Sequence, residues 1–258
     1  MASTSLELLR KDIDLKVITD KNVSTLWILL PFLSIIVALI FFAISIAFFS
    51  PVAPAPTFPF TFFTPGFGPF FAVFFLIDIL QLYFFYILIR RRNQHFARQH
   101  NLTTDIIAVL KDIAARKSIN IDGVLGSIEN IKRTEQVEET EKSAVLWVIL
   151  LLIPIVGIIA WLYIFYFLNY DFYNHEKRED FLLSDLERAF TALGLQFSFR
   201  RSSPIQHRSY VLYLVLTVIT FGLFGIYWEY TFITDGNNHF ANHSVFEQSI
   251  LQLVAAAV

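Results

Sequence analysis

The sequence predicts an all-α integral membrane protein, and three observations carry that prediction. Apolar residues make up 55% of the 258 residues, charged residues only 16%, and the mean hydropathy is +0.57. These values lie on the membrane side of the averages for soluble globular proteins. Several uncharged runs are long enough to cross a bilayer as helices. A spacing of two tyrosines and one histidine also occurs three times, which indicates three internal repeats.

The repeated spacing is a Tyr, a second Tyr three residues later and a His nine residues after that. The chain holds only ten Tyr and six His, so chance is a poor explanation. Each copy follows a long apolar run and precedes a short amphipathic one. The copies are Tyr83, Tyr86, His95; Tyr163, Tyr166, His175; and Tyr227, Tyr230, His239.

The repeats predict one continuous bundle rather than separate cores. The predicted order starts with an N-terminal amphipathic segment, residues 1–22. Repeat 1 follows at 23–117, with two spanning helices and a Pro/Phe-rich insertion at 50–69. A soluble loop covers 118–142, repeat 2 covers 143–196, a linker covers 197–208 and repeat 3 covers 209–258. In the N-terminal segment, apolar residues spaced by three or four predict a helix lying along a surface. The uncharged run 26–49 predicts the first span.

The Pro/Phe-rich insertion cannot form a continuous helix, because its six prolines remove hydrogen-bond donors. Two interpretations stay open. The segment is an aromatic loop at the membrane interface, or it is a surface for another membrane subunit or for self-association. The aromatic residues that would make this contact are Phe58, Phe60, Phe62 and Phe63.

A second span, residues 70–89, ends in Arg90, Arg91 and Arg92, which predicts a cytoplasmic end. Asp78 lies inside this span with Gln81 three residues later. An acid within a span suggests function by default. Asp78 could instead cap a helix at a break shared with the later repeats, or tie two helices by a hydrogen bond.

Beyond each histidine, apolar stripes predict amphipathic helices that lie on the membrane or pack under the bundle. Asp122-Gly123 predicts a turn within the soluble loop. Ser244-x-x-Glu247 predicts a capping box at the start of a last helix.

The 20 Lys and Arg residues constrain the topology, because cytoplasmic segments carry an excess of them. If runs 143–170 and 209–233 each cross once, the bases between 177 and 208 lie outside, against this bias. If each run turns back near 154–157 and 222–225, all the bases lie on the cytoplasmic side of the cell membrane, with the N-terminus. Both arrangements stay open.

The third repeat resembles a known family. It reads Leu-Thr-Val-Ile-Thr-Phe-Gly-Leu-Phe-Gly-Ile-Tyr-Trp over 216–228, followed by Asn237, Asn238 and His239. This is similar to domain of unknown function 4234, a small membrane domain with the pattern Thr-x-Gly-x-Tyr-Gly-x-Tyr-Trp; Phe224 stands where that family has its first Tyr. The resemblance covers mainly 209–243, is weaker over 143–175, and implies a membrane fold without a known activity.

Known catalytic patterns are absent from the sequence: it has no phosphate loop, no Gly-x-Ser-x-Gly, no His-Glu-x-x-His and no Cys. We therefore expect no enzyme, no catalytic residue and no cofactor, and a net charge of -2 argues against nucleic acid as a partner. The tyrosines read as interfacial anchors. His239 and His243 at i,i+4 can hold a metal on one helix face, but the histidines read first as polar interfacial residues, and no metal site is assigned.

The function expected from these observations is non-catalytic. The chain reads as a structural or accessory subunit that packs against lipids and other subunits of a membrane assembly. One alternative is a small channel or transporter with a polar path near Asp78 and Gln81, continued by Thr217 and Thr220. A second alternative is a metal- or ligand-binding membrane protein that uses the repeated Tyr and His positions.

Overall fold

The computed structural model describes residues 4–49 and 68–257, and all their regular secondary structure is helical. The helices are α1 (Thr4–Asp14), α2 (Lys16–Thr19), the 3-10 helix η1 (Thr25–Ile28), α3 (Leu29–Phe49), α4 (Gly68–Lys117), α5 (Asp122–Glu138), α6 (Ala144–Leu151), α7 (Val156–Ala192), α8 (Tyr210–Ile219) and α9 (Leu223–Ala257). Phe58, Phe60, Phe62 and Phe63 lie outside the described residues, so the contact expected of them stays a prediction.

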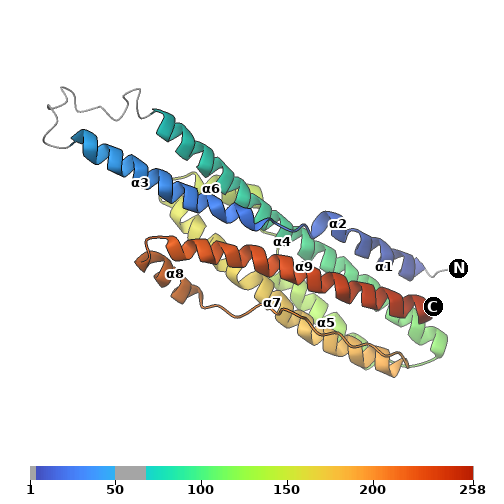
Figure 1. Ribbon diagram of the computed structural model, residues 1–258. Coiled ribbons are helices and arrows are strands. Elements are labelled where there is room, and N and C mark those ends of the chain that lie inside the picture. Colours follow the sequence, from blue (N-terminus) through green and yellow to red (C-terminus); the bar gives the residue numbers. More distant parts are fainter. Residues whose placement is uncertain (1–3, 50–67, 258) are drawn as a thin grey trace.

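Three helices, α4, α7 and α9, run along the length of the molecule (Figure 1). Three segments are long and apolar enough to cross a membrane: Thr25–Ile46, Gly68–Lys117 and Val156–Ala192. The prediction of an all-α chain with long apolar helices is therefore confirmed. Helix α1 and the C-terminal part of α9 lie at the end of the bundle opposite α6 and α8 (Figure 1).

The apolar runs of the second and third repeats each form a helical hairpin. The first turn contains Ile155 at φ 68, and the second contains Phe221 at φ 51 and Gly222 at φ 91. Aromatic contacts join the two arms of each hairpin. The ring centroids of Trp147 and Tyr163 are 4.7 Å apart, and those of Tyr213 and Phe224 are 4.9 Å apart. Each run therefore changes direction close to the break that the sequence predicts.

A serine caps the start of three apolar helical segments, η1, α6 and α8. The hydroxyl of Ser24 accepts a hydrogen bond from the amide of Leu26, and Ser143 and Ser209 cap α6 and α8 through the amides three residues later. Such caps satisfy amides that the first helical turn leaves free.

The core has one apolar cluster at each end and a small aromatic cluster between them. At the hairpin end, Phe84, Phe165 and Trp228 are buried together. At the other end, the predicted amphipathic stripes of α4, α7 and α9 pack with α1 and α5 rather than lying flat. The intermediate cluster consists of Phe96, Phe172, Ile205 and Phe240. This middle layer holds the candidate site.

Three local predictions are wrong. α4 continues unbroken through Asp78, so this residue caps no helix. Residues 122–138 form α5 rather than a loop, because Leu125 and Ile128 bury themselves against the bundle and stabilise a helix there. Ser244 lies inside α9 and is no N-cap; its hydroxyl accepts a hydrogen bond from Lys16 instead.

Candidate metal centre

The three histidines of the recurring Tyr-Tyr-His spacing meet in the middle of the bundle. His95 on α4, His175 on α7 and His239 on α9 are each 0% exposed. The helix period explains why: nine residues are about 2.5 turns, so each His faces the side opposite the Tyr that precedes it. The tyrosines accordingly face outward, and within each pair the rings stack 6.1 to 6.5 Å apart. The recurring spacing therefore sets an outer tyrosine and an inner histidine on each long helix.

A fourth imidazole, that of His243, joins the centre one turn beyond His239. Ring centroids of His95 lie 5.3 Å from His175, 4.8 Å from His239 and 5.0 Å from His243. The Nε2 atoms of His95 and His239 are 2.9 Å apart. One ring nitrogen from each of the four residues can be chosen so that all four lie within 4.8 Å of one another. We call these four residues the four-His centre.

Every imidazole of the four-His centre points Nδ1 at a carboxylate. The pairs are His95 with Asp20 at 3.1 Å, His175 with Glu139 at 2.8 Å, His239 with Glu176 at 3.0 Å and His243 with Glu247 at 2.8 Å. A carboxylate on Nδ1 fixes the ring orientation and the tautomer, and in His95, His175 and His239 it leaves the Nε2 lone pair free to bind a metal ion. Sites of this kind in metalloproteins share the same pairing. In His243 a second carboxylate, that of Glu179, lies 2.7 Å from Nε2.

Arginines hold the carboxylates in turn. Arg98 donates to two of them: Nη2 lies 2.5 Å from Oδ2 of Asp20, and Nη1 contacts Oε1 of Glu247. Arg178 binds Glu139 at 2.6 Å, and Arg201 binds Glu179. These contacts place a second layer of charged groups around the histidines.

The charges of the centre leave room for one further positive charge. Five acids contact the histidines, namely Asp20, Glu139, Glu176, Glu179 and Glu247, and three arginines and Lys16 contact those acids. The acids exceed these bases by one. Either a proton on His243 or a metal ion bound in its place offsets this excess.

The protonation of the histidines is uneven. Burial lowers the pKa of His95 and His239, so both rings are neutral near pH 7. Burial also lowers that of His243, but Glu179 and Glu247 outweigh it and raise the pKa to about 9. Its Nε2 lies 2.7 Å from Glu179. Burial also lowers the pKa of His175, but Glu139 outweighs it and raises that pKa. His243 must therefore exchange a proton for the metal ion, and the acids favour a proton on His175 as well, whereas His95 and His239 are ready to bind.

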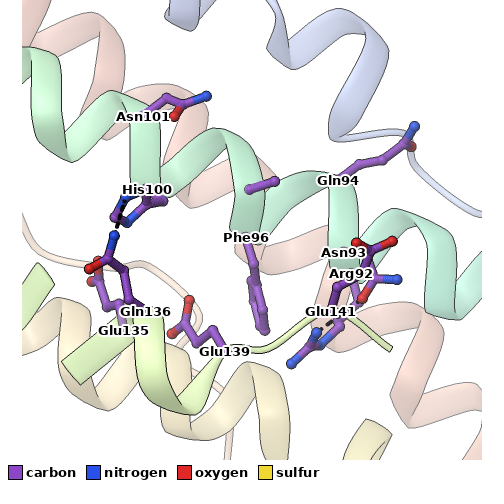
Figure 2. A pocket seen from close by; sticks show the side chains of 11 residues that line it. Arg92, Asn93, Gln94, Phe96, His100, Asn101, Glu135, Gln136, Glu139 and Glu141 are labelled. Carbon is purple, nitrogen blue, oxygen red and sulfur yellow. Dashed lines mark hydrogen bonds between the residues drawn. The ribbon is translucent and has the colours of Figure 1, made fainter. Parts of the chain in front are cut away.

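A pocket of about 490 Å³ lies next to the centre, between α4 and α5 (Figure 2). Phe96, His100, Glu135 and Glu139 are among its lining residues. His100 is not part of the four-His centre; its Nε2 lies 2.9 Å from the side-chain nitrogen of Gln136. The pairing of His95 with His100 therefore does not form a site.

The other candidates lie elsewhere. Asp78 is exposed on the apolar part of α4. Gln81 donates to both carboxylate oxygens of buried Glu229, each at 3.0 Å. The hydroxyls of Thr217 and Thr220 donate to carbonyls of their own helix, so they do not extend a polar path from Asp78.

The sequence analysis did not predict that the histidines converge, although their common spacing from the tyrosines indicates a shared inner face. The spacing of nine residues already sets each His opposite an exposed Tyr. The carboxylates carry no such signal, because Asp20 is 75 residues from His95 and Glu139 is 36 residues from His175.

The comparisons with known proteins found no match. No family model matches the chain, and neither the curated proteins nor the solved structures contain a match. The resemblance of residues 209–243 to domain of unknown function 4234 therefore stays a prediction.

Proposed function

We propose that this chain is a non-catalytic integral membrane protein that binds one divalent transition-metal ion in the four-His centre. The observation that carries the proposal is the pairing of all four Nδ1 atoms with carboxylates while the Nε2 atoms of His95 and His239 face each other at 2.9 Å. Four polar rings serving only as core residues would not need to converge on one point.

The spacing of the nitrogens suits a tetrahedral ion. With metal–nitrogen bonds of about 2.0–2.1 Å, ligand nitrogens in a tetrahedron are about 3.3 Å apart. That value lies between the 2.9 Å contact and the 4.8 Å limit of the cluster, so small side-chain shifts suffice. Imidazoles suit Zn²⁺, Cu²⁺ and Ni²⁺, and Zn²⁺ is the first candidate because it favours four-coordinate tetrahedral sites.

Four protein ligands leave no open position on a tetrahedral ion. Catalytic zinc sites keep such a position for water or substrate, whereas structural sites are closed. The centre thus supports a metal that ties α4, α7 and α9 together, in keeping with a protein that is not an enzyme. The first and second units then supply one ligand each, and the third supplies two, His239 and His243.

We further propose that the apolar hairpins insert into the membrane from the cytoplasmic side. α6 has eight residues and reaches only about 12 Å, too short to cross a bilayer alone. A hairpin arrangement places all twenty Lys and Arg residues on one side. A role as a subunit that packs with lipids and other proteins is compatible with this arrangement.

The test is metal analysis of protein purified in mild detergent. We expect close to one zinc ion per chain, and Co²⁺ substitution should give the intense visible absorption of tetrahedral cobalt. The double variant His95→Ala, His239→Ala should lose both signals. His207→Ala is the matched control, because this exposed histidine lies outside the centre. Folded wild-type protein that takes up no Zn²⁺, Co²⁺, Ni²⁺ or Cu²⁺ would overturn the proposal.

A further inference from the structure

Two lining residues of the α4–α5 pocket contact the four-His centre: Glu139, which binds Nδ1 of His175, and Phe96, through its ring. This ring lines the pocket and stacks on His175, with centroids 4.6 Å apart and an interplanar angle of 24°. Figure 2 shows Phe96 pointing into the pocket between His100 and Arg92. The guanidinium of Arg92 lies 4.3 Å from the centroid of the same ring. A single aromatic side chain therefore covers His175 on this side.

Glu135 forms part of the pocket wall and is only 2% exposed. Neither of its carboxylate oxygens has a hydrogen-bond partner among the described residues. A buried carboxylate without a partner is costly, and native structures rarely retain one without a reason. Packing supplies no reason here, because a leucine would fill the same space without that cost.

Glu135 interacts electrostatically with His175 of the four-His centre and with the acids around it. His175, Glu139 and Glu179 all act on its ionisation, and burial raises its pKa to about 7. The carboxylate therefore takes up and loses a proton near neutral pH, and a cation arriving from the pocket would displace that proton. Glu139, on the same wall, already binds Nδ1 of His175.

We propose that the α4–α5 pocket is the route by which the divalent ion reaches the four-His centre, with Glu135 as its transient ligand and Phe96 as the cover that must swing aside. The inference rests on the metal site proposed above. The hydrated ion diffuses into the pocket, and Glu135 replaces part of the ion's hydration shell. Nε2 of His175 then binds the ion. His175 fits this role because its Nε2 has no hydrogen-bond partner among the described residues.

Exchange kinetics test the route separately from the site. Metal-free protein is mixed with Co²⁺ in a stopped-flow instrument, and release is followed after adding a chelator in excess. Glu135→Gln should slow uptake about tenfold, since an acidic pocket raises the on-rate of a cation by at least that factor. Its final stoichiometry should stay at that of the wild type. Because the unpartnered charge is removed, this variant should also unfold at a temperature no lower than the wild type.

Phe96→Ala is the second variant, and it acts in the opposite direction. Removing the cover should speed uptake and release together, leaving the dissociation constant within about twofold. Glu129→Gln is the control: this acid lies on the same helix but pairs with Lys111 away from the pocket. Wild-type exchange rates in both Glu135→Gln and Phe96→Ala, with metal still bound, would overturn the route alone. Absence of metal from the wild type would overturn the site and the route together.

Discussion

The Nε2 atoms of His95 and His239 lie 2.9 Å apart in the interior of the bundle, although 144 residues separate them along the chain. Both rings direct Nδ1 at a carboxylate. If the hydrogen of each neutral ring is on Nδ1, two lone pairs face each other. Such a contact is favourable only when a positive charge, a proton or a metal ion, is shared between them. The three-helix junction therefore depends on what occupies this point.

The carboxylates around the centre should tune metal affinity without providing ligands. Glu176→Gln and Asp20→Asn should each weaken zinc binding by about 10–100-fold, because a neutral amide oxygen orients the ring and raises its basicity less than the carboxylate does. Competition against a chelator of known affinity measures the change. Asp14→Asn, an exposed acid on α1, should bind as the wild type does. Unaltered affinity in both centre variants would show that these acids do not support a metal.

The fold was largely predictable, because its signals are local. Hydrophobic runs and helical stripes report helices directly, and Pro154 and Gly222 mark the hairpin turns. The unbroken course of α4 through Asp78 was not predictable, since an isolated acid can either cap or continue a helix. Asp122-Gly123 is typical of a turn, but the segment is helical because Leu125 and Ile128 are buried against other helices. Local sequence patterns do not contain this tertiary contribution.

The site was predictable only in its histidines. Their common spacing identifies three equivalent positions, and the helix period sets them on inner faces. Glu247 shows why the rest was hidden. Its place three residues after Ser244 is typical of a capping box, yet its side chain binds Arg98 and His243. The partner of an ionisable group depends on which helices become neighbours.

Metal binding should depend on pH through His243, whose pKa is raised to about 9 by Glu179 and Glu247 against the effect of burial. Below pH 9 this ring carries a proton that the metal must displace. The dissociation constant for Co²⁺ should therefore fall about tenfold per pH unit between pH 7 and 9, as expected for the release of one proton. Titration at several pH values measures the slope. In Glu179→Gln the slope should flatten at a lower pH than in the wild type, because the proton is held less firmly; an identical pH dependence would mean that the proton released on binding is not that of His243.

Arg91 packs against the backbone of α9 where Gly236 leaves space. A Cβ at this position would lie 2.5 Å from Nη2 of Arg91. The guanidinium cannot move away freely, because it is 3% exposed and donates to the carbonyl of Phe232 at 2.6 Å. Gly236→Ala should therefore lower the free energy of unfolding by about 1–3 kcal/mol. Gly126→Ala, at an exposed position of α5 with nothing within 4 Å, should raise it by about 0.5–1 kcal/mol. Thermal unfolding in detergent compares the two, and equal shifts would contradict the close packing.

Gln81 and Asp78 lie about one turn apart on α4 but should respond differently to substitution. Gln81→Leu leaves the buried carboxylate of Glu229 without its donor, so we expect a loss of about 1–2 kcal/mol. Asp78→Asn, on the exposed side of the helix, should change stability by less than about 0.5 kcal/mol. Denaturation in detergent measures both. Loss of an ion flux in a stable Asp78→Asn variant would instead support the channel alternative.

The hairpins also predict the topology of the chain, and the chain's lack of cysteine makes it testable. Ser184 on α7 and Asn238 on α9 are exposed beyond the apolar hairpins. Asn237 is unsuitable, because its side chain binds Arg91 and the backbone of Val23. Since α6 and α8 fold back on α7 and α9, single cysteines at Ser184 and Asn238 should both react with a membrane-impermeant maleimide only from the cytoplasmic side. Reaction of the Ser184→Cys variant from outside would mean that the run 143–170 crosses the membrane, and it would exclude insertion as a hairpin.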